Sequence, residues 1–147
     1  SEMCIRDSNE HRYADILNQR IKLWHQSLQI CVRLFKTTTS YKKIQSIETS
    51  KNKKEKEITQ EELSLIYQEI NEAFIEAMQE LLEQYPSLTQ DDLYYCILNY
   101  LQLSNNTIKV CMKAGSQSAL TQRKYRIKKQ LSDLSFSIIF DAKGESK

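Results

Sequence analysis

The densest group of side chains suited to contact with a polyanion lies between Ser116 and Leu131. This stretch holds no acidic residue and five cationic ones, namely Arg123, Lys124, Arg126, Lys128 and Lys129. Leu120, Ile127 and Leu131 recur along one side of a predicted helix, which leaves cationic, amide and hydroxyl groups on the other side. Such a helix suits the major groove of DNA, where side chains read base edges and cations neutralise phosphates.

Two further helices are predicted directly before this stretch. Thr89 can cap the first, and Asp92 three residues later completes a capping box. Ser104 can cap a short second helix, and Gly115 is expected to end it by adopting a left-handed backbone. We therefore predict a helix-turn-helix DNA-binding unit over residues 87–131, with a plain three-helix bundle and a solvated basic face as the alternative.

Five residues of the third helix fall in a recognisable register: a serine, a small residue and an aliphatic, then an isoleucine and a closing leucine, at Ser116, Ala119, Leu120, Ile127 and Leu131. This register resembles the recognition helix of LuxR-type helix-turn-helix domains. The sequence departs from that pattern at three positions. Ala119 stands where threonine is common, Gln130 where lysine is common, and Gln102 where a glycine usually precedes the second helix.

Other motifs follow in order along the chain: Leu23-Trp24, ITQEEL from Ile58, FIEAMQELLEQYP from Phe74 to Pro86, Leu88-Thr89 with Tyr95-Cys96, and RKYRIKKQL from Arg123. From about Leu23 to Asp141 they resemble the C-terminal region of Bacteroidetes transcriptional regulators, although Leu63 stands where that family often has tryptophan. These regulators join a coiled coil to a LuxR-like domain, often behind tetratricopeptide or β-propeller sensors and a membrane span. The resemblance implies a cytoplasmic output fragment, with an upstream sensor region and an inner-membrane anchor as features of its parent protein.

The resemblance also assigns roles within the third helix. It implies that three groove-facing side chains contact bases, namely Thr121, Gln122 and Tyr125. Phosphate contacts are expected from Ser116, Ser118, Lys124, Lys128 and Lys129, together with the free amides of the helix N-terminus. Arg123 or Arg126 is expected to turn back and pair with an acid of a neighbouring helix.

A long helix is predicted for residues 9–37. Its apolar side chains alternate spacings of four and three, at Leu17, Ile21, Trp24, Leu28, Cys31 and Phe35. We expect this heptad seam to pair with a second copy of the chain and form a homodimer. A second apolar set widens the stripe, at Ile16, Leu23, Ile30 and Leu34, and indicates that the helix also packs on another element.

The remaining segments are predicted to connect or brace these helices. Residues 38–58 form a linker with a short helix, and residues 59–86 form one acidic bracing helix that begins with a Thr59–Glu62 capping box and ends at Pro86. Residues 132–147 form a C-terminal strap and tail, whose apolar side chains are Phe136, Ile138, Ile139 and Phe140. Residues 1–8 resemble a sequence-assembly scar and are set aside.

Composition supports an all-α fold. Among 147 residues there are 2 Gly and 1 Pro, with 27% charged and 40% hydrophobic residues. The net charge is only +2, but charged side chains are all acidic from Glu57 to Asp92 and all basic from Lys109 to Lys129. This segregation suggests one face that meets a polyanion and another that avoids it.

No catalytic or metal-binding motif stands out. The four cysteines form no CxxC pair and suggest reduced core residues, and His11 and His25 lack partners at useful spacing. We therefore expect no enzyme activity, no cofactor, no metal and, for this fragment, no membrane contact. The alternative function is a helical dimerisation and signalling module that binds a protein partner without DNA, and RNA binding is a weaker third option.

Overall fold

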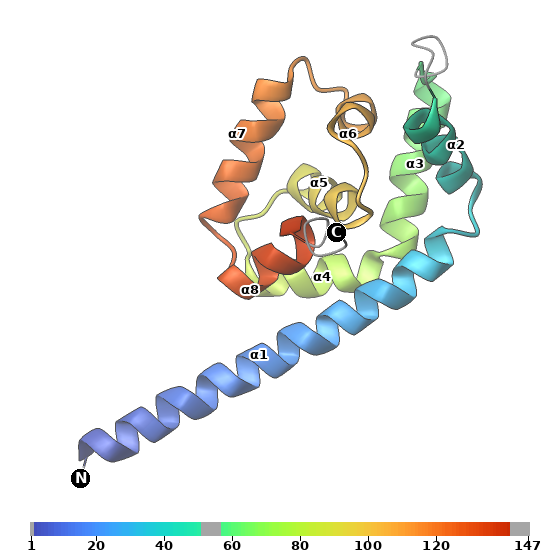
Figure 1. Cartoon of the computed structure of the whole chain (residues 1–147). Coiled ribbons are helices and arrows are strands. Elements are labelled where there is room, and N and C mark those ends of the chain that lie inside the picture. Colours follow the sequence, from blue (N-terminus) through green and yellow to red (C-terminus); the bar gives the residue numbers. More distant parts are fainter. Residues whose placement is uncertain (1, 51–56, 142–147) are drawn as a thin grey trace.

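The computed structural model describes residues 2–50 and 57–141, with side chains of the first helix described from Ser8 onward, and within these ranges it is all-helical, as predicted (Figure 1). The elements are α1 Glu2–Phe35, α2 Thr39–Thr49, α3 Gln60–Ala73, α4 Ile75–Gln84, α5 Gln90–Tyr100, α6 Asn105–Met112, α7 Gln117–Lys128 and α8 Asp133–Phe136, followed by a π-helical turn, Ser137–Asp141. In the described part of the chain, no helix combines the length and apolarity needed to span a bilayer.

α1 is one long helix, as predicted for residues 9–37, but it begins earlier, at Glu2. The helix therefore includes most of segment 1–8, for which no helix is predicted, and Ser1 lies outside the described residues. Its C-terminal half packs against α3 and α4, and its N-terminal half projects beyond the body of the molecule (Figure 1). α1 thus has one end anchored in the fold and one end exposed.

The predicted dimer seam of α1 is buried inside the chain, which corrects that prediction. Ile21, Trp24, Leu28 and Phe35 are buried, and Leu17 and Cys31 are partly buried against the same core. The Trp24 indole N–H donates a hydrogen bond to the Ala77 carbonyl oxygen of α4 (2.9 Å), and the Phe35 ring packs against Phe74, with centroids 6.0 Å apart. The second apolar set remains exposed instead: Ile16, Leu23, Ile30 and Leu34.

The predicted bracing helix is two helices, α3 and α4, which meet in a corner at Phe74 (Figure 1). Phe74 leaves helical geometry (φ −109°, ψ 16°) while its side chain is completely buried. Helical backbone hydrogen bonds continue on both sides of the bend: the Phe74 N–H donates to Ile70 O (2.9 Å), and the Met78 N–H donates to Phe74 O (2.8 Å). Burial of this ring between α1 and the corner explains a bend for which the sequence has neither glycine nor proline.

α2 is longer than the short helix expected within the linker 38–58. Thr38 caps it by accepting a hydrogen bond from the Tyr41 N–H (3.2 Å), and Ile44 and Ile47 are buried. Within the predicted linker 38–58, residues 51–56 lie outside the described residues. α2 packs on α3 and α6, so it belongs to the folded body.

α5 lies at the centre of the fold. Every residue from Asp92 to Leu98 is buried. The π-helical turn packs on α5, and α8 packs on this turn and on α1, with Phe136 and Ile139 buried. The predicted C-terminal strap is therefore present, and the end of the predicted tail (142–147) lies outside the described residues.

Candidate nucleic-acid interface

α6 and α7 are joined by a four-residue connection, Lys113–Ser116. Lys113 takes the left-handed conformation (φ 51°), whereas Gly115 does not have a positive φ. The prediction for Gly115 was wrong because α6 ends earlier, at Met112, so the C-cap falls on the lysine. The Lys113 ammonium donates a hydrogen bond to Gln60 Oε1, which fastens the connection to α3.

The connection between α5 and α6 holds the other left-handed residue, Gln102 (φ 62°). Glycine adopts this conformation without a steric penalty, whereas a residue with a side chain adopts it at a cost. Gln102 therefore has a backbone conformation that favours glycine.

The inner side of α7 is held by two apolar residues and an ion pair. Leu120 and Ile127 are buried, and the Arg123 guanidinium lies 2.6 Å from Asp92 Oδ1. The other oxygen of Asp92 accepts a hydrogen bond from the Thr89 N–H (3.0 Å), so one buried carboxylate both caps α5 and holds α7. The expectation that Arg123 or Arg126 turns inward is confirmed for Arg123, and Arg126 is exposed.

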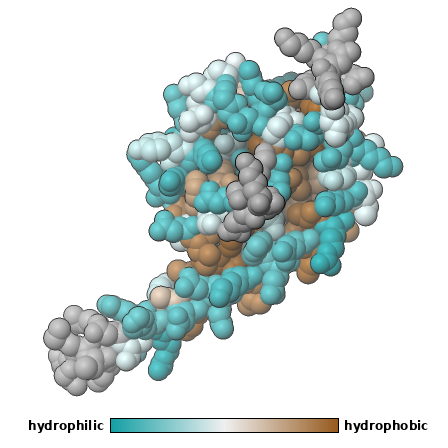
Figure 2. Space-filling view, viewed as in Figure 1, coloured by the Kyte–Doolittle hydropathy of each residue, from teal (hydrophilic) through white to brown (hydrophobic). Residues whose placement is uncertain are grey.

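The outer side of α7 is polar and exposed. Tyr125 is 61% exposed, and the Lys129 ammonium lies 4.4 Å from the centre of its ring. Helical spacing places these two residues on one face with three other exposed side chains, Ser118, Thr121 and Gln122. Figure 2 shows a mostly hydrophilic surface over this helix.

The two other predicted lysines differ in their surroundings. Lys124 is half-buried, and its ammonium lies 5.3 Å from the centre of the Phe140 ring. Lys128 is exposed at the edge of the polar face, with its ammonium 5.2 Å from the Phe136 ring centre. Seven of the eight residues predicted to contact DNA are therefore exposed, while Lys124 is held on the flank by cation–π contacts.

The N-terminus of α7 differs electrostatically from those of α5 and α6. α5 has Asp91 and Asp92 in its first turn, and the Glu48 carboxylate accepts hydrogen bonds from the Ser104 N–H (2.9 Å) and Ser104 Oγ (3.0 Å) at the start of α6. The first turn of α7 has no acidic residue, and Ser116 caps it by accepting from the Ala119 N–H (3.2 Å). Within the described three-helix unit α5–α7, α7 is therefore the helix whose positive end has no carboxylate beside it.

Glu48 is a residue that sequence reasoning missed. It reaches Ser104 from α2, across 56 residues of chain, so no local pattern reveals the contact. Two other acids pair with basic side chains: Arg20 lies 3.8 Å from Glu80, and Lys43 lies 3.2 Å from Glu62.

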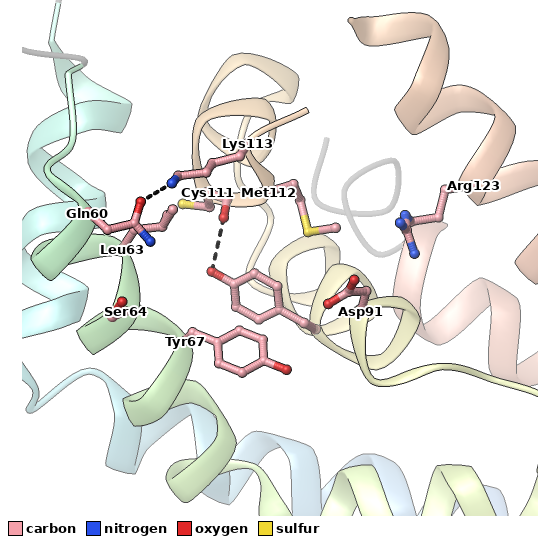
Figure 3. A pocket seen from close by; sticks show the side chains of 10 residues that line it. Gln60, Leu63, Ser64, Tyr67, Asp91, Cys111, Met112, Lys113 and Arg123 are labelled. Carbon is pink, nitrogen blue, oxygen red and sulfur yellow. Dashed lines mark hydrogen bonds between the residues drawn. The ribbon is translucent and has the colours of Figure 1, made fainter. Parts of the chain in front are cut away.

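A pocket of about 310 Å³ lies behind α7, between α3, α5 and α6 (Figure 3). Its floor includes Tyr67 and Tyr94, whose ring centres are 4.9 Å apart, and the Tyr94 hydroxyl donates to Cys111 O (3.4 Å). Burial raises the pKa of the Cys111 thiol to about 12 and also raises the pKa of Tyr94. Both groups are neutral at physiological pH, so neither supplies a nucleophile or a base to the pocket.

Metal binding finds no support in the described ranges, where no group of three His, Cys, Asp or Glu side chains lies close enough to hold an ion. Comparisons with known protein families, with curated proteins and with solved structures find no significant match to this chain.

Proposed function

We propose that this chain binds double-stranded DNA and acts as the output part of a transcriptional regulator, with α7 in the major groove. The observation that carries the proposal is the combination found on α7: an exposed polar and cationic face that continues to an N-terminus without a carboxylate. Anions bind at such helix ends, and base edges are read by side chains on such faces. The proposal assigns no catalytic role to the chain.

The proposed contacts follow from the placement of each side chain. Thr121, Gln122 and Tyr125 face outward and would reach base edges, where a glutamine amide can form two hydrogen bonds with adenine. Ser116, Ser118 and the first amides of α7 would hold a phosphate. Lys128 and Lys129 are exposed and would neutralise backbone phosphates, whereas Lys124 is half-buried and is left out of this role.

α6 has a supporting role in this proposal. The Glu48 carboxylate occupies the N-terminus of α6, so that end repels phosphate instead of binding it. The DNA backbone would then be held mainly from α7. The Asp92–Arg123 pair sets the orientation of α7, which makes Arg123 a positioning residue.

The test is binding of the full chain to pooled random duplex DNA at two salt concentrations, followed by selection and sequencing. We expect an enriched site and a steep fall of affinity with salt, because phosphate contacts release counterions. Lys128→Ala should weaken binding to all sequences and reduce the magnitude of the salt slope by about 0.9. Gln122→Ala should relax base preference at one position, with a loss of about 1–3 kcal/mol in discrimination.

The matched control is Lys42→Ala, which removes the same charge from an exposed position on α2 and should leave DNA affinity unchanged. The proposal fails if Gln122→Ala and Lys128→Ala both leave affinity unchanged, or if the folded protein retains no DNA at low salt. Salt-insensitive binding to a protein partner would then favour a helical signalling module.

A further inference from the structure

A row of large apolar side chains lies uncovered along α1. The exposed fractions are 72% for Tyr13, 61% for Ile16, 65% for Leu23, 63% for Ile30 and 60% for Leu34. The core-facing side of the same helix, at Ile21, Trp24, Leu28 and Phe35, is almost completely buried. α1 therefore has two apolar sides, of which the fold covers one. We name the uncovered row the outer stripe.

The outer stripe follows a heptad repeat. Its residues are separated by three, seven, seven and four positions, and the two intervening seam positions are Arg20 and Ser27. Tyr13, Arg20, Ser27 and Leu34 then occupy one seam position of each heptad (a), and Ile16, Leu23 and Ile30 occupy the other (d). Residues at these two positions interlock with the same residues of a second helix. The outer stripe is thus complementary to a copy of itself.

The polar seam position Arg20 is turned toward its own chain. Its guanidinium lies 3.8 Å from Glu80 and 3.6 Å from Glu83, both on α4. These contacts draw the charge away from the seam, so that in a pair of helices the two Arg20 side chains need not meet. Polar seam positions lower the stability of a coiled coil and fix its register.

The two flanks of the outer stripe carry opposite charge. On one flank α4 lies beside the helix and contributes Glu80 and Glu83. The other flank carries Arg12 and Arg33, both exposed. In a parallel pair each flank meets the opposite flank of the partner helix, whereas in an antiparallel pair like flanks meet. A parallel pair therefore brings arginines toward the acidic edge of α4 and keeps the two bodies on opposite sides.

We propose that a second copy of this chain covers the outer stripe, as a parallel two-stranded coiled coil in register. The paired segment, from Tyr13 to Leu34, is about 33 Å long at ~1.5 Å per residue. That length and the two polar layers make the dimer weak, so it dissociates on dilution. The dimer does not depend on the proposed function, although it would place two α7 helices on one DNA.

The test is the mass of the full chain in solution, measured by sedimentation velocity over a range of concentrations without DNA. We expect the wild type to reach twice the monomer mass as concentration rises, and Ile30→Glu to stay monomeric. Ile30 is exposed, so the variant should keep its helix content and thermal midpoint. Leu23→Glu is a second variant with the same expected outcome.

The matched control is Ile75→Glu on α4, which makes the same chemical change at a position 52% exposed outside the outer stripe. It should dimerise like the wild type. A wild type that stays monomeric at every concentration overturns the proposal, and so does an Ile30→Glu variant that dimerises normally. Equal loss of dimer in Ile75→Glu and Ile30→Glu also overturns it, because the interface would then not be the outer stripe.

The parallel orientation of the two α1 helices is tested separately. In a parallel pair in register, Ile16 faces its copy, so Ile16→Cys should form a cross-linked dimer on mild oxidation, beyond any formed by the wild type. A dimer that does not cross-link at this position overturns the parallel arrangement. Failure of DNA binding in a chain that dimerises would count against the proposed function alone, whereas a monomer that binds DNA would count against the dimer alone.

Discussion

α5 and α7 are neighbouring helices of similar length with opposite surroundings. In α5 every residue from Asp92 to Leu98 is buried, whereas in α7 the buried residues are Leu120 and Ile127. Packing therefore dictates most of the α5 sequence and little of the α7 sequence. The polar face of α7, with a 61% exposed tyrosine, is therefore free of packing constraints.

We expect the largest loss of stability when the ion pair between α5 and α7 is broken. Arg123→Ala leaves the Asp92 carboxylate, whose side chain is 5% exposed, buried without its partner. We expect the free energy of unfolding to fall by about 3–5 kcal/mol, measured by urea denaturation. Arg126→Ala removes an exposed arginine from the same helix and should change stability by less than about 0.5 kcal/mol.

A second substitution separates charge from packing at this position. In the Arg123→Ala background, Asp92→Asn removes the unpaired charge while its amide oxygen can still accept the Thr89 N–H. Part of the lost stability should return. Equal effects of Arg123→Ala and Arg126→Ala would show that α7 is not anchored by this pair.

Alkaline pH should lower the free energy of unfolding, because it ionises buried thiols of α5 and α6. Burial raises the pKa of Cys96 in α5, and it raises the pKa of Cys111 in α6 to about 12. The folded state holds these protons more tightly, so the stabilisation is complete below the unfolded thiol value of about 8.5 and is lost as pH rises toward the folded values. Each thiol should contribute a loss of up to about 1.4 kcal/mol per pH unit above that value.

The measurement is the free energy of unfolding in urea at several pH values above neutrality. Cys111→Ala should unfold with a shallower dependence on pH than the wild type, because one titrating group is gone. An identical pH dependence in the two proteins would show that the Cys111 thiol is not shielded from water as the structure indicates.

The smallest effect is expected at the connection between α5 and α6. Gln102 has φ 62°, so Gln102→Gly relieves a left-handed strain of ~1 kcal/mol or more and adds a smaller cost in backbone entropy. We expect thermal denaturation to show a gain of about 0.5 kcal/mol. Lys113→Gly relieves similar strain but loses the hydrogen bond to Gln60, so its gain should be smaller. A destabilised Gln102→Gly protein would contradict this account.

Local signals predicted the three-helix unit well. Thr89 and Ser104 cap the helices that the sequence assigns to them, and each accepts a hydrogen bond from the N–H of the third residue after it. Ser116, the predicted start of the third helix, caps α7 in the same way. In the predicted bracing segment, Ile66, Ile70, Phe74, Ala77 and Leu81 are buried, whereas Leu65, Ile75 and Leu82 are exposed. Capping and helical periodicity depend on neighbours within one or two turns, so one sequence is enough to show them.

The features that the sequence did not predict depend on contacts between distant parts of the chain. Both apolar sides of α1 have coiled-coil spacing, and the choice between them depends on α4, whose Ala77 carbonyl accepts the Trp24 N–H. At the bend, the Phe74 ring packs against Phe35 of α1. The half-buried Lys124 lies beside the rings of Phe136 and Phe140. Each of these contacts joins residues far apart in the chain, so periodicity and capping do not report it.

The length of α1 has a mechanical consequence. Its 34 residues form a rod of about 51 Å, held at one end by the Trp24 hydrogen bond and the Phe35–Phe74 ring contact. One residue added or removed in the projecting half would turn everything before it by about 100° around the rod axis, whereas seven added residues would restore the angle to within about 20°. α1 therefore transmits torsion as well as distance, so a region joined to its exposed end would act on the body by rotation.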